Sequence, residues 1–180
     1  MIEYQFKSGD IIAFSGRNFL SDIINVGTYG IPRWSISHVG IVATGRTGSI
    51  NWLFEALSIG LKGRNIREVI EEYNGRIWVY PLYRKLYSFE GTRLFESLRD
   101  VVDIPYDKEG AGRSAGFLFS SIQALFRGQD LSTFFCSELI ANKLSEIGIH
   151  PVTNASKWNP NRLVRDLRND RVVCKPIRLK

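Results

Sequence analysis

The 180-residue chain has few of the side chains that build disulfide-rich or metal-dependent proteins. It contains two cysteines, Cys136 and Cys174, and two histidines, His38 and His150. Two cysteines do not make a disulfide framework, and no paired CxxC or HExxH spacing is present for zinc. The sequence also has no phosphate-binding P-loop and no glycine-rich dinucleotide motif. We therefore expect neither a metal nor a cofactor.

Long apolar runs and an export signal are missing as well. No apolar stretch approaches the roughly 20 residues that a membrane-spanning helix needs. The first residues lack the basic-then-apolar pattern of a signal peptide. We expect no transmembrane segment and a cytoplasmic or phage-encoded protein, so that any contact with a cell wall or membrane surface is peripheral.

Negative charge is in the minority. Lys and Arg number 24 and Asp and Glu number 18, which gives a formal net charge of +6. A basic surface favours anionic partners, but the cations are spread along the chain and no nucleic-acid-binding signature accompanies them. We expect a small anionic peptide or lipid as substrate rather than nucleic acid.

The pattern of apolar residues predicts one α+β domain over residues 1–180. Apolar runs and period-two alternation predict strands, and spacings of three and four predict helices. Strands are expected at 11–14, 38–42, 52–57, 76–82 and 172–177, and helices at 18–26, 67–73, 89–102, 115–126, 134–147 and 160–167. This order of elements favours a mainly antiparallel sheet packed against helices.

Three side chains form a candidate constellation for nucleophilic catalysis. Cys136 is predicted to open a helix, where unpaired N–H groups and the positive end of the macrodipole stabilise a thiolate and an oxyanion. His38 begins a strand and is held more firmly than His150, which lies in a loop, so His38 is the candidate base. Glu55, a carboxylate between apolar strand neighbours, is the candidate that orients the imidazole.

Each of these residues also has an ordinary structural interpretation. A cysteine on an apolar helix face is most often a small core residue. A histidine in a strand is often no more than a hydrogen-bonded structural residue, and Glu55 can simply pair with an arginine. Spacing alone does not decide between these interpretations and a cysteine enzyme.

Several short segments occur in an order that is typical of a known family. They are residues 9–16, 35–42, 54–56, 105–107 and 135–140, with 159–163 as a downstream element. Together they resemble the YiiX-like group of circularly permuted NlpC-type papain-like cysteine peptidases. In that group the histidine strand precedes the cysteine helix, which reverses the usual papain order.

The resemblance implies a papain-like fold with Cys136 as nucleophile at a helix N-terminus, His38 as base and Glu55 as the third polar residue. It also implies that Tyr106 lies near the site, and we expect Tyr106 and Ser137 to take part in oxyanion or substrate binding beside the amide of Cys136. The implied activity is hydrolysis of an amide bond, by default in peptidoglycan stem peptides, through an acyl-thioester.

Two alternatives to this activity stay open. The permuted branch also suggests a hydrolase or acyltransferase that acts on lipid amides or esters. A protein of a different class, a binding or virion structural module with a vestigial site, is the second alternative. The presence of all three catalytic residue types favours an active enzyme.

Overall fold

The computed structural model describes residues 4–16, 36–45, 48, 50–57, 60–102, 132–151 and 159–180. The structural statements below concern these residues. The helices predicted over 18–26 and 115–126 lie outside them, as does Tyr106.

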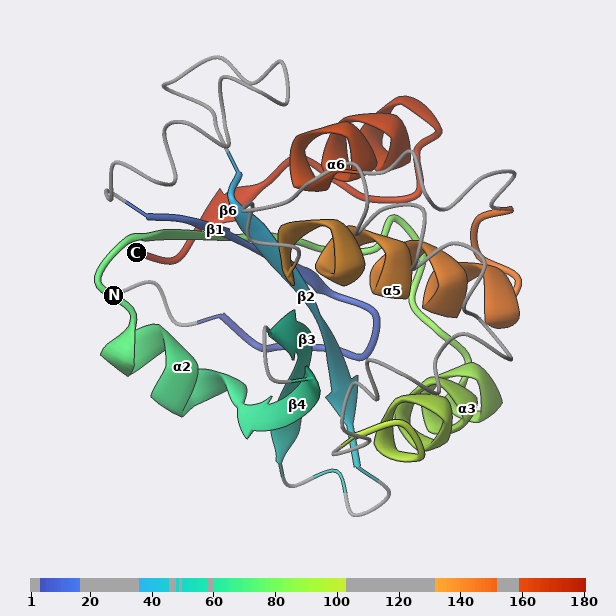
Figure 1. Ribbon diagram of the computed structural model, residues 1–180. Coiled ribbons are helices and arrows are strands. Elements are labelled where there is room, and N and C mark those ends of the chain that lie inside the picture. Colours follow the sequence, from blue (N-terminus) through green and yellow to red (C-terminus); the bar gives the residue numbers. More distant parts are fainter. Residues whose placement is uncertain are drawn as a thin grey trace, which may run out of the picture.

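An antiparallel sheet of six strands forms the centre of the described structure (Figure 1). The strand order is β4-β3-β2-β1-β5-β6, and each neighbouring pair is antiparallel. The strands are β1 (Ile11–Ser15), β2 (His38–Thr44), β3 (Asn51–Leu57), β4 (Gly60–Asn65), β5 (Arg76–Tyr80) and β6 (Ile177–Arg178). This arrangement confirms the predicted α+β class and its antiparallel sheet.

Helices cover both faces of the sheet. The described helices are α2 (Ile66–Glu72), α3 (Ser88–Arg99), α5 (Ser132–Glu146) and α6 (Pro160–Asn169). Figure 1 shows α3, α5 and α6 on one face and α2 on the other. Helix α5 packs on β2 and β3, which are the strands that carry His38 and Glu55.

Strand β1 lies in the middle of the sheet and is buried on both faces. Ile11 and Ala13 belong to the core beneath α3, α5 and α6, whereas Ile12 and Phe14 belong to the core beneath α2. Burial of each large side chain contributes about 1.5–3 kcal/mol. A strand with two buried faces needs apolar residues at every position, which explains the unbroken apolar run in the sequence.

The two edge strands differ from the prediction. Strand β4 was not predicted, because it lacks the apolar pattern by which strands are recognised. It is an edge strand that pairs only with β3, so it can carry glycines and cations where a central strand needs apolar side chains. Strand β6 is shorter than the predicted 172–177 and covers only Ile177–Arg178. Pro176 has no N–H to donate to a ladder, and upstream of it only Val173 forms an isolated bridge, with Leu82.

Gly40 allows β2 and β3 to approach closely beside the candidate site. A Cβ atom at this position would lie 2.6 Å from Leu53 Cδ1 and 3.1 Å from the carbonyl oxygen of Phe54. The register pairs Ile41 with Phe54, and its continuation sets Gly40 opposite Glu55. The missing side chain therefore leaves room for Leu53 and for the backbone of Phe54 on β3.

We expect Gly40→Ala to lower the free energy of unfolding by about 1–3 kcal/mol, because the added methyl group overpacks the contact with β3. Urea denaturation followed by circular dichroism measures this change. Gly91→Ala in α3 is the matched control: its Cβ would meet nothing closer than 3.7 Å, and alanine is the better helix former. An equal loss of stability in both variants would contradict the close-approach explanation.

Candidate active site

His38 and Glu55 lie on adjacent strands and form a hydrogen bond. Nε2 of His38 is 2.9 Å from Oε2 of Glu55, and the Glu55 side chain is only 2% exposed. An ionised carboxylate can only accept hydrogen bonds, so Nε2–H of His38 is the donor. This bond selects the tautomer: in the neutral imidazole, Nδ1 carries the lone pair that can accept a proton.

Arg64 on β4 is the second partner of Glu55. Its Nε and Nη2 atoms lie 2.9 and 2.6 Å from Oε1 of Glu55, on the oxygen that His38 does not contact. Glu55 thus orients an imidazole and pairs with an arginine at the same time, although the sequence presented these as alternatives. Arg64 was missed because it lies on the unpredicted strand β4, whose pairing with β3 brings it beside Glu55.

The two partners keep the Glu55 carboxylate ionised. Burial by itself raises the pKa of Glu55. The hydrogen bond and charge of His38, followed by those of Arg64, outweigh this effect and lower the pKa of Glu55 below its ordinary value. A negative charge therefore remains behind the imidazole at neutral pH.

Cys136 on α5 is the side chain on the other side of His38 from Glu55. Its side chain has no exposed surface and belongs to the core cluster that joins α5 to the sheet. Cys136 also makes a side-chain hydrogen bond with His38. Because Nε2 is engaged with Glu55, the ring nitrogen left for the sulfur is Nδ1. The His38 side chain remains 19% exposed, so the imidazole is the more accessible member of the pair.

The surroundings of His38 favour its protonated form. Burial by itself lowers the pKa of His38. The negative charge of Cys136 and its hydrogen bond, followed by the hydrogen bond and charge of Glu55, raise the pKa to about 10. At neutral pH this favours the imidazolium form of His38.

The start of the cysteine helix requires a correction. Helix α5 begins at Ser132 rather than at residue 134, so Cys136 is its fifth residue and does not open it. The sequence places Ser132 and Thr133 there, which are residue types favoured at helix starts. The unpaired N–H groups of a helix lie in its first turn. The amide of Cys136 lies one turn further along, where helical bonding to residue 132 engages it.

The remaining candidate residues fall into three different situations. Ser137 follows Cys136 in α5 and is buried, and its part in oxyanion or substrate binding stays a prediction. Tyr106 lies outside the described residues. His150 lies beyond the C-terminal end of α5, where its Nδ1 atom is 3.8 Å from Oδ2 of Asp170. The structure therefore brings His38, and not His150, to Cys136.

Asn161 fixes the segment that leads into the histidine strand. The amide N–H of Ile36 donates to Oδ1 of Asn161 over 2.8 Å, and Nδ2 of Asn161 donates to the carbonyl of Ile36 over 3.1 Å. Ile36 lies two residues before His38, so this pair sets the entry of β2. Asn159 caps α6, but the role of Asn161 depends on a contact across 125 positions that no local pattern reveals.

Comparison with known proteins identifies a similar fold. No family model matches the chain, and no curated protein matches it. Its structure is similar to the crystal structure of the metalloprotein YiiX from Escherichia coli O157:H7, with 19% sequence identity, a TM-score of 0.53 and 98% of each chain covered. The chain therefore has a YiiX-like fold.

Two further findings concern the described residues alone. No three His, Cys, Asp or Glu side chains among them gather in a way that would hold a metal ion. None of the helices within them is both long enough and apolar enough to cross a bilayer.

We expect His38 in the wild-type protein to titrate with a pKa of about 10, and Cys136→Ala and Glu55→Gln each to lower this pKa toward the ordinary value of about 6.5. Proton NMR of the imidazole C–H signals measures it, and His38→Asn assigns the signal. Because folding raises the pKa, the stability that His38 contributes is complete below about pH 6.5 and is lost as the pH rises through about 10. A wild-type value near 6.5 that Cys136→Ala leaves unchanged would contradict the contact.

We expect Asn161→Ala to lower the free energy of unfolding by about 1–3 kcal/mol, because it leaves backbone groups of Ile36 without their partners. It should also shift the NMR signal of His38. Asn159→Ala in the same segment is the control: it removes the cap of α6 at a cost of about 1 kcal/mol and should leave the His38 signal in place. An unchanged His38 signal in both variants would show that Asn161 does not position the histidine strand.

Proposed function

We propose that this protein is a cysteine hydrolase in which Cys136 is the nucleophile and His38 transfers the proton. The observation that carries the proposal is the continuous row of side-chain contacts from Cys136 through His38 to Glu55. Nucleophile, base and orienting carboxylate stand in that order in cysteine and serine hydrolases. The histidine strand comes before the cysteine helix in the chain, and this order supports a place among permuted NlpC-type papain-like enzymes.

In the first half-reaction the sulfur of Cys136 attacks the carbonyl carbon of an amide, and the carbonyl electron pair moves to oxygen. When this oxyanion collapses, the C–N bond breaks and Nδ1–H of His38 protonates the departing amine. The product that stays on the enzyme is an acyl-thioester. Glu55 accepts from Nε2–H throughout, so it stabilises the imidazolium and keeps Nδ1 directed at the sulfur.

In the second half-reaction neutral His38 accepts a proton from water through Nδ1, and the resulting hydroxide attacks the thioester carbonyl. The C–S bond then breaks and releases a carboxylic acid. The negatively charged sulfur is restored beside the protonated His38. The same ring nitrogen therefore acts as acid in one half and as base in the other.

The oxyanion needs hydrogen-bond donors, whose removal typically costs 10²- to 10³-fold in rate. We propose Tyr106 and Ser137 for this role. The amide of Cys136 is less suited to it than the sequence suggested, because Cys136 is the fifth residue of α5. Donors from outside the helix ladder are therefore the better candidates.

For the substrate we propose an amide bond in peptidoglycan stem peptides first and a lipid amide or ester second. The net charge of +6 suits either, since both substrates are anionic. The lipid candidate gains support from large side chains that the described surface exposes, namely Tyr83, Tyr87 and Phe89.

The test incubates wild type, Cys136→Ala and Cys174→Ala with purified peptidoglycan and with phospholipid, and identifies products by mass spectrometry. We expect Cys136→Ala to lose product formation by at least about 10³-fold, because it removes the nucleophile. Cys174→Ala is the matched control: it removes the other thiol, whose sulfur contacts the carbonyl of Leu82, and should retain activity.

The products separate the candidate functions. Peptide fragments that depend on Cys136 support the stem-peptide hydrolase, and released fatty acids support the lipid enzyme. If neither substrate gives a product that depends on Cys136, the hydrolase proposal is wrong for these substrates and a non-catalytic module takes its place. Alkylation by iodoacetamide at neutral pH adds an independent measure, since an activated thiol reacts faster than an ordinary one.

A further inference from the structure

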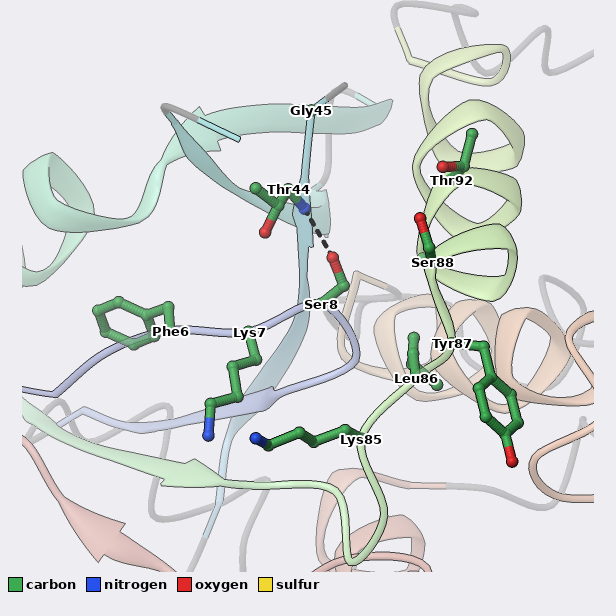
Figure 2. Close-up of a pocket in the computed structure, with 11 residues that line it drawn as sticks. Phe6, Lys7, Ser8, Thr44, Gly45, Lys85, Leu86, Tyr87, Ser88 and Thr92 are labelled. Atoms are coloured by element: carbon green, nitrogen blue, oxygen red, sulfur yellow. Dashed lines mark hydrogen bonds between the residues drawn. The ribbon is translucent and has the colours of Figure 1, made fainter. Parts of the chain in front are cut away.

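A concave site lies at the opposite end of strand β2 from His38. The cavity has a volume of about 380 Å³. Figure 2 shows its lining residues on the turn before β1, at the end of β2 and at the start of α3. The polar side chains that line it are Lys7, Ser8, Thr44, Lys85, Ser88 and Thr92. Since His38 begins β2 and Thr44 ends it, the cavity lies roughly 20 Å from the candidate active site.

Two cations converge on this cavity. In Figure 2 the amino groups of Lys7 and Lys85 point toward one another. Neither lysine takes part in an ion pair within the described part of the chain. Like charges that converge repel one another unless an anion lies between them. The arrangement therefore favours an anionic ligand.

The nearby carboxylates already have other partners. Glu90 accepts from both terminal nitrogens of Arg84, over 2.8 and 2.7 Å, and from the amide of Tyr87. Asp10 is buried and accepts from the hydroxyl of Tyr4 and from the backbone N–H of Lys7. The amino group of Lys85 thus forms no ion pair with Glu90, and that of Lys7 is attracted by the charge of Asp10 without a hydrogen bond to it among the described residues.

Hydroxyl groups make the cavity suitable for phosphate oxygens. Ser88 and Thr92 are four residues apart on α3 and lie on the same side of the helix, toward the cavity. Hydroxyls donate hydrogen bonds, and ammonium groups strengthen such bonds to an anionic oxygen. A volume of about 380 Å³ lies within the range of small-molecule pockets and exceeds that of a bare phosphate.

Exposed aromatic side chains lie near this cavity, and Figure 2 shows the ring of Tyr87 directed away from the two lysines. Tyr87 lines it and is 64% exposed, and Phe89 is 70% exposed. Their rings stack in parallel, with centroids 5.8 Å apart. Tyr83, four residues before Tyr87, is equally exposed. Exposed tyrosine and phenylalanine rings are suited to the interface between a bilayer and water.

We propose that the aromatic–lysine patch, which comprises Lys7, Lys85, Tyr83, Tyr87 and Phe89, binds the surface of an anionic phospholipid bilayer. The lipid phosphate lies between the two amino groups, and the stacked rings enter the headgroup region. The lysines alone would suit an acidic protein equally well, but the protruding rings favour a lipid surface. This inference does not depend on the chemistry of Cys136.

The test is cosedimentation of the full chain with vesicles of phosphatidylcholine that contain no phosphatidylglycerol or about a third of it, at low salt. We expect binding to the anionic vesicles only. The double variant Lys7→Gln, Lys85→Gln should weaken it about 25-fold, since each lysine near an anionic surface contributes about five-fold. Phe89→Ser should weaken it by roughly ten-fold through lost apolar contact.

The matched control removes two exposed cations elsewhere, with Lys175→Gln and Arg165→Gln, and should retain at least half of the binding; melting curves verify that each variant is folded. An equal loss in both double variants would overturn the patch in favour of unspecific attraction. Binding to neutral vesicles alone, or to polyglutamate peptide but not to vesicles, would also overturn it. Inorganic phosphate at millimolar concentration should not displace the protein from the vesicles, because the rings contribute to binding. Complete displacement would show that the site binds phosphate alone and would overturn the proposed bilayer contact.

Discussion

The described site depends on one buried negative charge, the Glu55 carboxylate. An ionised carboxyl group that is nearly inaccessible to water is strongly disfavoured unless hydrogen bonds and opposite charges surround it. Here one oxygen meets His38 and the other meets Arg64. These contacts join β2, β3 and β4, because each strand supplies one of the three side chains. The pairing of the strands and the orientation of the imidazole are therefore consequences of the same group.

Parts of this site follow from the sequence by simple geometry. His38 and Glu55 could be assigned to strands from their apolar neighbours, and Cys136 to a helix from its period. Arg64 and Asn161 could not be found in this way. Arg64 lies on an edge strand that lacks an apolar pattern, and Asn161 acts through a contact between distant segments. The helix start was misplaced by two residues, since the apolar period on which the prediction relied begins only after Ser132 and Thr133.

Strand β2 links two regions with different chemistry. Its first residue, His38, contacts Glu55 and Cys136, whereas its last residue, Thr44, borders the cavity with two lysines. Between these ends the strand is buried, and it packs against α3 and α5. A rigid central strand keeps both regions at a fixed separation, since packed interiors do not deform gradually.

The hydrogen bonds between Ile36 and Asn161 also affect when the site can form during synthesis. The ribosome makes Ile36 early and Asn161 125 positions later. Until α6 has emerged, the segment before His38 lacks both of these bonds. Cys136 is made shortly before Asn161, so at about 5–20 residues per second the nascent chain spends roughly 1–5 seconds with its thiol and imidazole made but not yet assembled. The segment that leads into the histidine strand therefore reaches its final contacts only once α6 can pack against it.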